Sequence, residues 1–366
     1  MLHIVNSNFE FTLNRNKQIP LEEELEEKEV YLQLQFLPFL YGKEGEQVAL
    51  LGTPEQNYFE SLIDKGISPS LEQLPQPYKS NTNSLEIPKL NPWAADQQIS
   101  VWASKQGITL NPPSQELLKK INSKRYSFEQ CPKLPGSQLV SNLEELQSLF
   151  DKKLAKFVLK SEFGVAGKGQ FLVEESNANS LEKARKFCEV EWKKGSVLIA
   201  EPWMDRVFDF SSQWFIESPQ SIQFLGSVIL ESSEHGQYLG SVAGPEYLLF
   251  EGKRQALGAH LVEAMKVLKQ MAIEGYYGHV GIDAMVYKTA QSSEEQLHPV
   301  VEINARKTFG WVAIQIQSRL FPQKHIRLSY EDKAKGTGIP LLPETLELEN
   351  GRKIRFKRQL FLSAPR

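Results

Sequence analysis

Three polar residues alternate with apolar ones in HPVVEINAR, residues 298–306. In a strand alternate side chains share a face, so Glu302, Asn304 and Arg306 would project together while their apolar neighbours face the other way. A carboxylate and an amide supply oxygen atoms of the kind that Mg²⁺ binds, and a guanidinium binds phosphate oxygens. The spacing therefore predicts a site for metal and phosphate on one face of a buried strand.

A further carboxylate lies inside another apolar segment, HVGIDAMVYK at 279–288. Taken alone, Asp283 is typical of a structural aspartate that is exposed or paired. If the strands at 279–288 and 298–305 are antiparallel neighbours, however, Asp283 joins Glu302 and Asn304 on one face. Three oxygen donors then converge, which suits one or two Mg²⁺ ions, with Mn²⁺ as the alternative metal.

A glycine-rich loop, GVAGKG at 164–169, lies between two predicted strands. It does not match the phosphate-binding P-loop, because Glu162 stands where glycine is required and Gly169 where serine or threonine binds magnesium; Leu172 breaks the GxGxxG pattern. Such a loop on its own is typical of a plain hairpin. A hairpin with little side chain can also fold over a polyphosphate through its backbone N–H groups, and Lys160 before it would add positive charge.

The order of these segments resembles the ATP-grasp superfamily, whose members include carboxylate–amine and carboxylate–thiol ligases. The resemblance runs from INSKRYS at 121–127, through the glycine loop and EPWM at 201–204, to ARKTFG at 305–310, about half of the chain. EINAR with an upstream GID is its most specific part. The resemblance implies an ATP-grasp fold of α/β and α+β type, with an N-terminal pre-ATP-grasp α/β domain and two lobes that enclose ATP.

The resemblance also implies the extent of each domain. The pre-ATP-grasp α/β domain would span 1–120, the small lobe with the glycine-rich lid 121–205, and the large lobe with the metal site 206–325. Residues 326–366 would form a C-terminal extension, whose role the sequence leaves open.

Each site residue takes an implied role from the same resemblance. Glu201 would accept a hydrogen bond from the adenine amino group, with the backbone of Trp203 or Met204 against the ring. Asp209 would bind the ribose, and Arg306 would contact the γ-phosphate or an acyl phosphate. The remaining implied contacts are with the phosphates, from Lys124, Lys160 and a lid of Gly164, Val165, Ala166, Gly167, Lys168 and Gly169, and with Mg²⁺, from Asp283, Glu302 and Asn304.

One feature of several peptide-forming members is missing here, an arginine just ahead of the metal aspartate. The segment reads GHVGID, so His279, or Arg254 before a long predicted helix, is the alternative contact for substrate. A lone histidine is more often structural.

The implied activity is an ADP-forming ligation in two steps. ATP phosphorylates a carboxylate, and an amine or other nucleophile then attacks the acyl phosphate, with Lys160 and Arg306 as the catalytic residues that position the γ-phosphoryl group. The superfamily's habits favour an amino-acid or peptide-like acid. A small-molecule kinase would keep the same nucleotide and metal residues. A non-catalytic ATP-binding protein is the third alternative. The three oxygen donors of the implied metal site argue against it, because a protein without activity has no reason to keep them together.

The elements that must position these residues follow from apolar periodicity and turn residues. Strands are predicted at 31–42 and 47–52, with a loop rich in proline, serine and asparagine at 67–92. A polar hairpin loop is predicted at 289–297 between the two metal-site strands, and Asn350-Gly351 indicates a tight hairpin. Helices are predicted at 55–66, 94–107, within 108–122, and at 141–153, 180–195 and 252–275.

Bulk composition narrows the partners. The 366 residues carry a net charge of −3, so the chain has no basic field for nucleic acid or an anionic membrane. Two cysteines, Cys131 and Cys188, form no disulfide framework, and the N-terminus lacks the apolar core of a signal peptide. These features predict a soluble cytoplasmic protein that binds ATP, a small carboxylate and a small nucleophile; a homodimer is left open.

Overall fold

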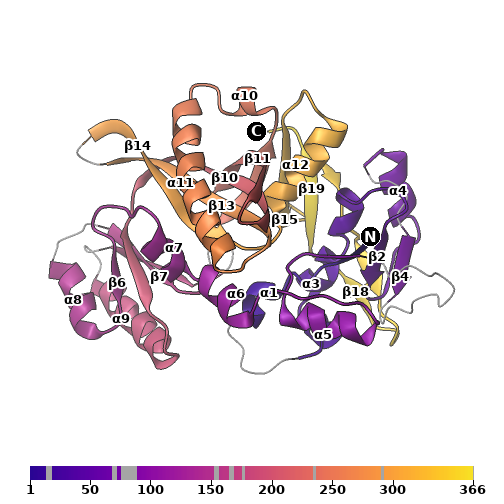
Figure 1. The fold of residues 1–366 in the computed structure, drawn as a ribbon, viewed down its shortest axis with the longest axis horizontal. Helices are drawn as coiled ribbons and strands as arrows, with labels where there is room; N and C mark the ends of the chain where they lie inside the picture. The colour runs from indigo at the N-terminus through magenta and orange to yellow at the C-terminus, as the bar shows by residue number, and fades with distance from the viewer. Residues whose placement is uncertain are drawn as a thin grey trace.

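Within the described residues, four β-sheets organise the chain in this computed structural model (Figure 1). An eight-stranded sheet lies in the middle, a four-stranded antiparallel sheet with two helices at the lower left, and a four-stranded parallel sheet at the right. The fourth sheet has three short strands. The structure describes residues 1–13, 19–67, 72–75, 89–151, 156–164, 169–174, 178–233, 236–289 and 292–365.

The N-terminal sheet is parallel, with the strand order β4-β2-β1-β5. Its central strands, LHI and QVAL, are buried apart from the partly exposed Gln47, as expected of strands that are covered on both faces. The strands are β1 Leu2–Ile4, β2 Gln47–Leu50, β4 Glu72–Pro75 and β5 Leu90–Pro92, and the helices around them are α1 Phe9–Thr12, α2 Leu21–Glu26, α3 Glu29–Leu34, the 3₁₀ helix η1 Leu37–Leu40, α4 Tyr58–Asp64 and α5 Gln97–Lys105.

The strand prediction at 31–42 is wrong, because this segment contributes to α3 and forms η1. All its side chains are buried, so the alternation of leucine and glutamine does not mark an exposed face. Both glutamines are satisfied inside the core. Gln33 donates to two backbone carbonyls, and Gln35 exchanges hydrogen bonds with the backbone of Leu51.

Two predicted loops contain strands. β4 and β5 lie within 67–92, although 68–71 and 76–88 fall outside the described residues. The predicted loop 289–297 is mostly the first half of β14, Ser292–Asn304, which pairs with the end of β13, Gly278–Thr289. These two strands form a ribbon that projects beyond the core (Figure 1), and residues 293–296 are exposed. A ribbon with solvent on both faces needs no apolar residues, so the pattern of a buried strand is absent.

The small antiparallel sheet has the order β6-β9-β7-β8. Two helices, α8 and α9, share one apolar core with it. The predicted start of α8 is confirmed: Asn142 accepts a hydrogen bond from the Glu145 backbone N–H, and the Glu145 carboxylate accepts one from the Ser141 backbone N–H. The elements are β6 Gln138–Val140, α8 Leu143–Asp151, β7 Lys156–Ser161, β8 Gln170–Glu174, α9 Ala178–Lys193 and β9 Leu198–Pro202.

The eight-stranded sheet has the order β14-β13-β10-β11-β12-β15-β19-β16, and every neighbouring pair of strands is antiparallel. Helices α11 and α12 pack against it. Its elements are β10 Asp205–Ser218, β11 Ser221–Ser232, β12 Tyr238–Ala243, α10 Glu246–Leu249, α11 Arg254–Ile273, β13 Gly278–Thr289, β14 Ser292–Asn304, α12 Phe309–Leu320, β15 Ile326–Asp332, β16 Ile339–Pro340 and β19 Arg358–Ser363.

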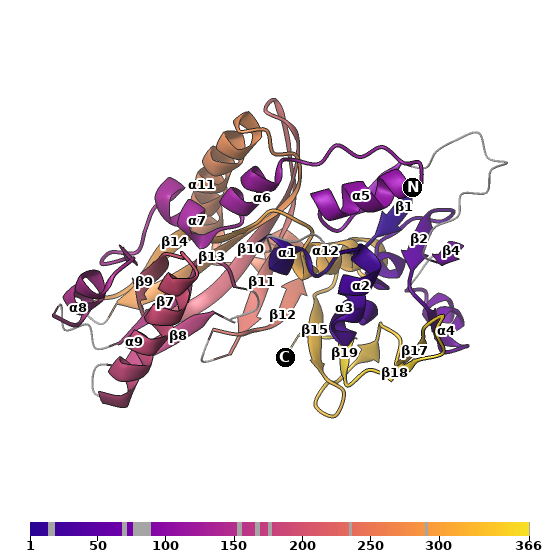
Figure 2. The same cartoon turned by 90° about the horizontal axis from the view of Figure 1, so that it is seen from below.

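The C-terminal segment joins two parts of the molecule. Its strands β15 and β19 extend the large sheet. Strand β17 Thr345–Glu347 pairs with β18 Lys353–Arg355 on one side and with β3 Thr53–Pro54 on the other. Figure 2 shows β17 and β18 on the side of the molecule where α4 and the N-terminal sheet lie. The hairpin signal at Asn350-Gly351 is confirmed, since Gly351 has a φ of 80° in the turn between β17 and β18. The four domain boundaries stay predictions.

The other sequence predictions concern helices and cysteines. Helix α7, Lys124–Gln130, is an additional helix that the periodicity did not indicate. Both cysteines are free and buried. In the described part of the chain, no helix combines the length and the apolar character needed to cross a membrane. The helices predicted at 55–66, 94–107, 108–122, 141–153, 180–195 and 252–275 are confirmed as α4, α5, α6 (Gln115–Ile121), α8, α9 and α11.

Candidate active site

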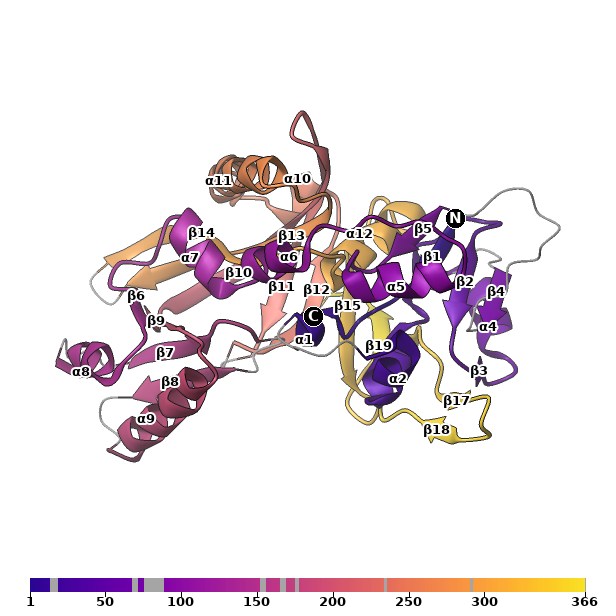
Figure 3. The same ribbon diagram turned by 60° about the horizontal axis from the view of Figure 1, so that its bottom comes forward.

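A cleft of about 290 Å³ is lined by residues from the N-terminal region, the small sheet and the large sheet. Figure 3 shows the small sheet and the N-terminal sheet on either side of the large one, with α1 near the middle of the molecule. Eight of the residues selected from the sequence line this cleft: Lys124, Lys160, Gly164, Asp209, Asp283, Glu302, Asn304 and Arg306.

The three candidate metal ligands lie together on the pair of strands that the sequence predicted. β13 and β14 are antiparallel, with Asp283 opposite Glu302 and Gly281 opposite Asn304, so all three polar side chains share one face. The amide nitrogen of Asn304 is 3.4 Å from a carboxylate oxygen of Asp283. The predicted pairing of the strands is therefore confirmed, whereas the role of these residues as metal ligands stays a prediction.

The charges at this position fit a divalent cation. Burial and the negative charge of Glu302 raise the pKa of Asp283 from 3.8 to about 7. The Lys124 ammonium donates to Glu302 at 2.6 Å and to the carbonyl of Gly164 at 3.0 Å, so a cation already offsets one carboxylate. Two carboxylates and an amide are a set of oxygen donors suited to Mg²⁺ or Mn²⁺ rather than zinc.

The donor set is small. Among the described residues, no group of three or more histidine, cysteine, aspartate or glutamate side chains is arranged to hold a metal. A metal at Asp283 and Glu302 would therefore depend on Asn304 and on oxygens from a bound substrate or water, which is how Mg²⁺ is usually held.

Two buried lysines approach the cleft from different elements. Lys124 begins α7, where Ser123 caps the helix by accepting a hydrogen bond from the Tyr126 backbone N–H. Lys160 lies near the end of β7 and contacts Glu201 at 2.5 Å. Both lysine side chains are less than 10% exposed, so their charges are aimed into the protein and its cleft rather than into bulk solvent.

The predicted lid is only partly described. Gly164 lines the cleft, and Gly169 lies just before β8 with a φ of 78°. A Cβ atom on Gly169 would approach the Ser161 hydroxyl to 3.2 Å, so both conformation and space favour glycine there. Val165, Ala166, Gly167 and Lys168 lie outside the described residues.

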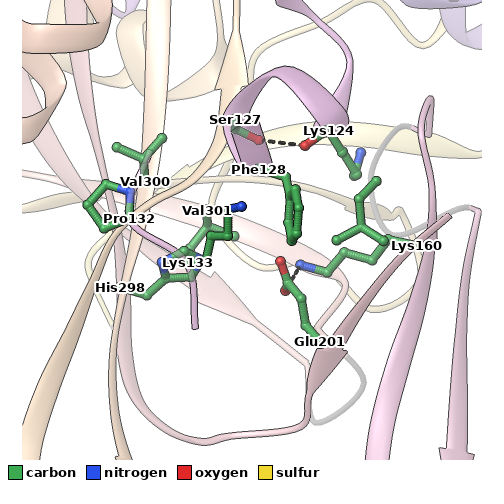
Figure 4. A pocket seen from close by; sticks show the side chains of 11 residues that line it. Lys124, Ser127, Phe128, Pro132, Lys133, Lys160, Glu201, His298, Val300 and Val301 are labelled. Atoms are coloured by element: carbon green, nitrogen blue, oxygen red, sulfur yellow. Dashed lines mark hydrogen bonds and ion pairs between the residues drawn. The ribbon is translucent and has the colours of Figure 1, made fainter. Parts of the chain in front are cut away.

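Glu201 lies on a second, much smaller cavity of about 10 Å³ beside the cleft (Figure 4). Both cavities share Lys124 and Lys160. In Figure 4 the ring of Phe128 lies beside the Lys160–Glu201 pair, and His298 lies on the side of Glu201 that faces away from Lys160. Burial alone would raise the pKa of Glu201, but the charge and hydrogen bond of Lys160, together with the nearby His298 and Arg206, hold that pKa below its usual range.

Trp203 and Met204, which follow Glu201, make contacts away from the two cavities. The Trp203 backbone N–H donates to the carbonyl of Lys156, and its indole stacks near two cationic side chains. Met204 packs in a small apolar cluster that includes Leu134 and Met285. Neither Trp203 nor Met204 lines either cavity, so their contact with adenine stays a prediction.

The remaining predicted polar residues are held by ion pairs. Asp209 lines the cleft and contacts Arg206 at 2.8 Å. The Arg306 guanidinium donates to Glu10 through Nε at 2.7 Å and to the Asn304 side-chain oxygen through Nη2 at 3.2 Å. Arg306 is therefore fixed beside the candidate metal ligands by a carboxylate from α1.

The two alternative substrate contacts lie elsewhere. His279 packs against the rings of Phe215 and Trp311, and Arg254 is exposed at the start of α11. Neither residue is among those that line the cleft.

Known proteins match this chain in the comparison of structures. No protein-family model and no curated protein matches the sequence. The match to phosphoribosylamine–glycine ligase from Thermotoga maritima covers 90% of this chain and 90% of the ligase, at 13% identity and with a TM-score of 0.58. Biotin carboxylase from Campylobacter jejuni covers 100% of this chain and 88% of its own at 15% identity and a TM-score of 0.52. N5-carboxyaminoimidazole synthetase from Staphylococcus aureus covers 100% and 93% at 12% identity, with a TM-score of 0.50.

These solved structures are ATP-grasp proteins. The chain has the ATP-grasp fold. The fold class inferred from the order of the motifs is therefore confirmed.

The ATP-grasp fold also brings residues to the cleft that the sequence did not single out. Ser7, Glu10 and Trp93 come from the N-terminal region, and Thr308 and Phe309 from the start of α12. No motif marks the first three, because their position depends on how the N-terminal sheet docks. Thr308 and Phe309 directly follow EINARK in the sequence. This closeness to the strand with the candidate metal ligands was the one feature of the sequence that could have indicated them.

Lys307 is a further residue of this kind. It is buried, and its ammonium donates to Asn91 at 2.6 Å and to the Pro92 carbonyl at 2.9 Å. Burial lowers its pKa from 10.5 to about 7. Because β5 contains both partners, Lys307 ties the segment after β14, which carries Arg306, to the N-terminal sheet.

Proposed function

We propose that the protein is an ATP- and Mg²⁺-dependent ligase that joins a carboxylate to an amine or other nucleophile through an acyl phosphate, releasing ADP and phosphate. The observation that carries the proposal is one cleft lined by two buried lysines, the paired carboxylates Asp283 and Glu302, and Arg306. Transfer of a phosphoryl group needs little covalent chemistry from a protein. It needs positioned cations and metal ligands, for which the side chains of this cleft are the candidates.

The chain's own residues would act by exchanging partners. Phosphate oxygens compete with Glu302 for the Lys124 ammonium and with Glu201 for the Lys160 ammonium. Glu302 is thereby released to join Asp283 and Asn304 in holding Mg²⁺, which offsets phosphate charge when bound. Arg306, kept near these residues by Glu10, would orient the γ-phosphoryl group and the carboxylate that receives it.

The solved structures support the ligase class at the level of the fold. The name of the Thermotoga protein describes the joining of phosphoribosylamine and glycine, and the Campylobacter biotin carboxylase was solved as a complex with β,γ-ATP. A nucleotide in the cleft and a carboxylate as the phosphoryl acceptor are the corresponding proposals for this chain.

Trapping of the acyl phosphate tests the proposal. The protein is incubated with ATP, Mg²⁺, pooled carboxylic acids and hydroxylamine, and ADP and hydroxamate are measured. A hydroxamate that requires both ATP and Mg²⁺ is the expected result. ADP released only with hydroxyl-bearing acceptors, and no hydroxamate, would replace the ligase with a kinase. ATP binding with no turnover in any pool would replace it with a non-catalytic ATP-binding protein.

A pair of glutamate variants on β14 controls this assay. Glu302→Gln keeps the side-chain shape but removes a candidate metal ligand, so it should abolish Mg²⁺-dependent turnover. Glu295→Gln changes an exposed residue on the same strand, 52% exposed and 4.0 Å from Lys288, and should behave like the wild type. Full activity in Glu302→Gln would refute the metal assignment.

A further inference from the structure

The cleft has a charged part and an uncharged part. Among the described residues that line it, every charged side chain comes from α1, α7, β7, β10, β13, β14 or the residue after β14. The residues that line it from β11, β12 and the first turn of α12 carry no charge. We call these residues the uncharged floor; those with side chains that matter below are Leu230, Ser232, Tyr238, Ser241 and Phe309.

The charges that β11 carries are turned away from this floor. Leu230 and Ser232 line the cleft, whereas Glu231 between them does not. Its carboxylate instead accepts a hydrogen bond from Arg327 at 2.5 Å. Leu230 lies directly opposite Asp209 of β10 in the sheet. The uncharged floor therefore begins one strand away from the charged part of the same cleft.

Aromatic rings form a wall of the uncharged floor. The rings of Tyr238 and Phe309 are nearly parallel, with their centroids 6.2 Å apart and their planes at 10°. On its other side Phe309 is nearly parallel to Tyr330, at 6.3 Å and 18°. Tyr238, Phe309 and Leu230 are all partly exposed, so apolar surface of each remains open to a ligand. The Tyr238 hydroxyl is already engaged, since it shares a hydrogen bond of 2.9 Å with Ser241. Such a surface suits the flat face of another ring.

A second anionic group would find no spare cation in this cleft. Among the described lining residues, Lys124, Lys160, Arg206 and Arg306 are each paired with a carboxylate. In the ligation proposed above, the two lysines and Arg306 bind ATP and the acid, and Arg206 stays with Asp209. A phosphate or carboxylate on the nucleophile would lie over the uncharged floor without a partner, which is unfavourable.

We infer that the nucleophile of the proposed ligation is an amine on an uncharged aromatic body, which packs against Leu230, Tyr238 and Phe309. The inference rests on the ligase function proposed above and names its second substrate. The amine attacks the acyl carbon in its unprotonated form, through the nitrogen lone pair. The C–N bond forms, phosphate leaves with the electron pair of the C–O bond, and the proton that nitrogen loses passes to solvent.

Amines that share one aminoethyl group test the inference. An acid that yields a hydroxamate is incubated with ATP, Mg²⁺ and 2-phenylethylamine, 2-cyclohexylethylamine, β-alanine or phosphoethanolamine, and the amide is measured by mass spectrometry. The kcat/KM for 2-phenylethylamine should exceed that for each anionic amine by about tenfold or more, because only the anionic amines bring an unpaired charge to the floor. It should exceed that for the cyclohexyl amine by about threefold, because a flat ring stacks and a puckered one does not.

A variant of the aromatic wall separates packing from general damage. Phe309→Leu keeps an apolar side chain but removes the ring. It should lower amide formation from 2-phenylethylamine relative to hydroxamate formation by the same variant, because hydroxylamine has no body to pack against the floor. The control is Tyr247→Leu on α10, where the tyrosine is 56% exposed and outside the cleft; it should keep the wild-type ratio. If Phe309→Leu does not fold, Tyr238→Leu replaces it.

The outcomes distinguish the inference from the function on which it rests. Amide formed equally well from β-alanine, phosphoethanolamine or the cyclohexyl amine would overturn the inference and leave the ligase in place. Hydroxamate without amide from any of the four amines would do the same, as would an unchanged ratio of amide to hydroxamate in the folded variant. No hydroxamate from any acid would overturn both.

Discussion

Binding of Mg²⁺ should release a proton from Asp283 below pH 7. Because burial and the charge of Glu302 raise its pKa to about 7, the metal-free protein holds this carboxyl protonated at lower pH. A cation coordinates the ionised form, so each pH unit below 7 should lower the Mg²⁺ affinity about tenfold. Between pH 7 and pH 5 the loss is about a hundredfold, or about 2.7 kcal/mol of binding free energy.

The same shift should destabilise the metal-free fold. In the unfolded chain this carboxyl ionises near its ordinary pKa of 3.8, so the folded state binds the proton more tightly between there and pH 7. Stability therefore falls as the pH rises through that window, by a total on the order of 4 kcal/mol. Asp283→Asn cannot ionise and should unfold at a higher temperature than the wild type at pH 8 without metal.

Calorimetric titration with Mg²⁺ in two buffers of different ionisation enthalpy measures the proton directly. At pH 6 about one proton should leave per ion bound, and at pH 8 almost none. Asp283→Asn should remove the release, whereas the exposed Glu295→Gln should retain it. A Mg²⁺ affinity that is constant from pH 5 to pH 7, or proton release that persists in Asp283→Asn, would refute the reasoning.

Three further expectations concern stability. Lys160→Met leaves Glu201 buried without its cation and should lower the free energy of unfolding, measured in urea, by about 3–5 kcal/mol. The double variant with Glu201→Gln should recover most of this loss, and additive effects of the two substitutions would contradict the pairing. Burial lowers the pKa of His260 to about 4, so stability should drop by about 3 kcal/mol as the pH falls from 6.5 to 4, and His260→Gln should flatten that dependence; parallel curves would argue against it. Gly169→Ala should cost more than the about 1–2 kcal/mol expected at Gly252, which has a similar φ but open space; equal melting temperatures would show that Ser161 is not in the way.

The core of the site was predictable because one local rule decides it. A period of two places Glu302 and Asn304 on one face of β14, and the same rule applied to β13 selects Asp283 for the same face. The apolar residues between them fix the register, because a slip of one position would bury the carboxylates. Where the chain is buried on all sides, as at 31–42, this rule has no exposed face to detect and the strand prediction fails.

The substrate end of the cleft was not predictable for a different reason. Glu10 and Arg306 are 296 positions apart, and no short-range pattern relates them. Their contact depends on the docking of the N-terminal sheet, to which Lys307 contributes through Asn91 and Pro92. Residues of this kind are found only once the tertiary fold is known.

The cations of the cleft suggest how its ligands assist one another. Among the described residues that line it, Lys124, Lys160, Arg206 and Arg306 are each paired with a carboxylate. Under the proposed function, a nucleotide alone would have to break the Lys124–Glu302 pair and would leave Glu302 beside Asp283 without a cation. Mg²⁺ alone must compete with Lys124 for the same Glu302.

If both ligands bind as proposed, the phosphates would pair with Lys124 and Glu302 would be free to hold the metal, so each ligand would remove the cost that the other bears alone. ATP and Mg²⁺ should therefore bind the protein with positive coupling beyond their affinity for each other in solution. Lys124→Met should weaken that coupling, since Glu302 is then free before either ligand arrives. Calorimetric titrations of ATP at several Mg²⁺ concentrations, corrected for the ATP–Mg²⁺ complex, measure it; an equal coupling in Lys124→Met would mean that the Lys124–Glu302 pair does not link the two ligands.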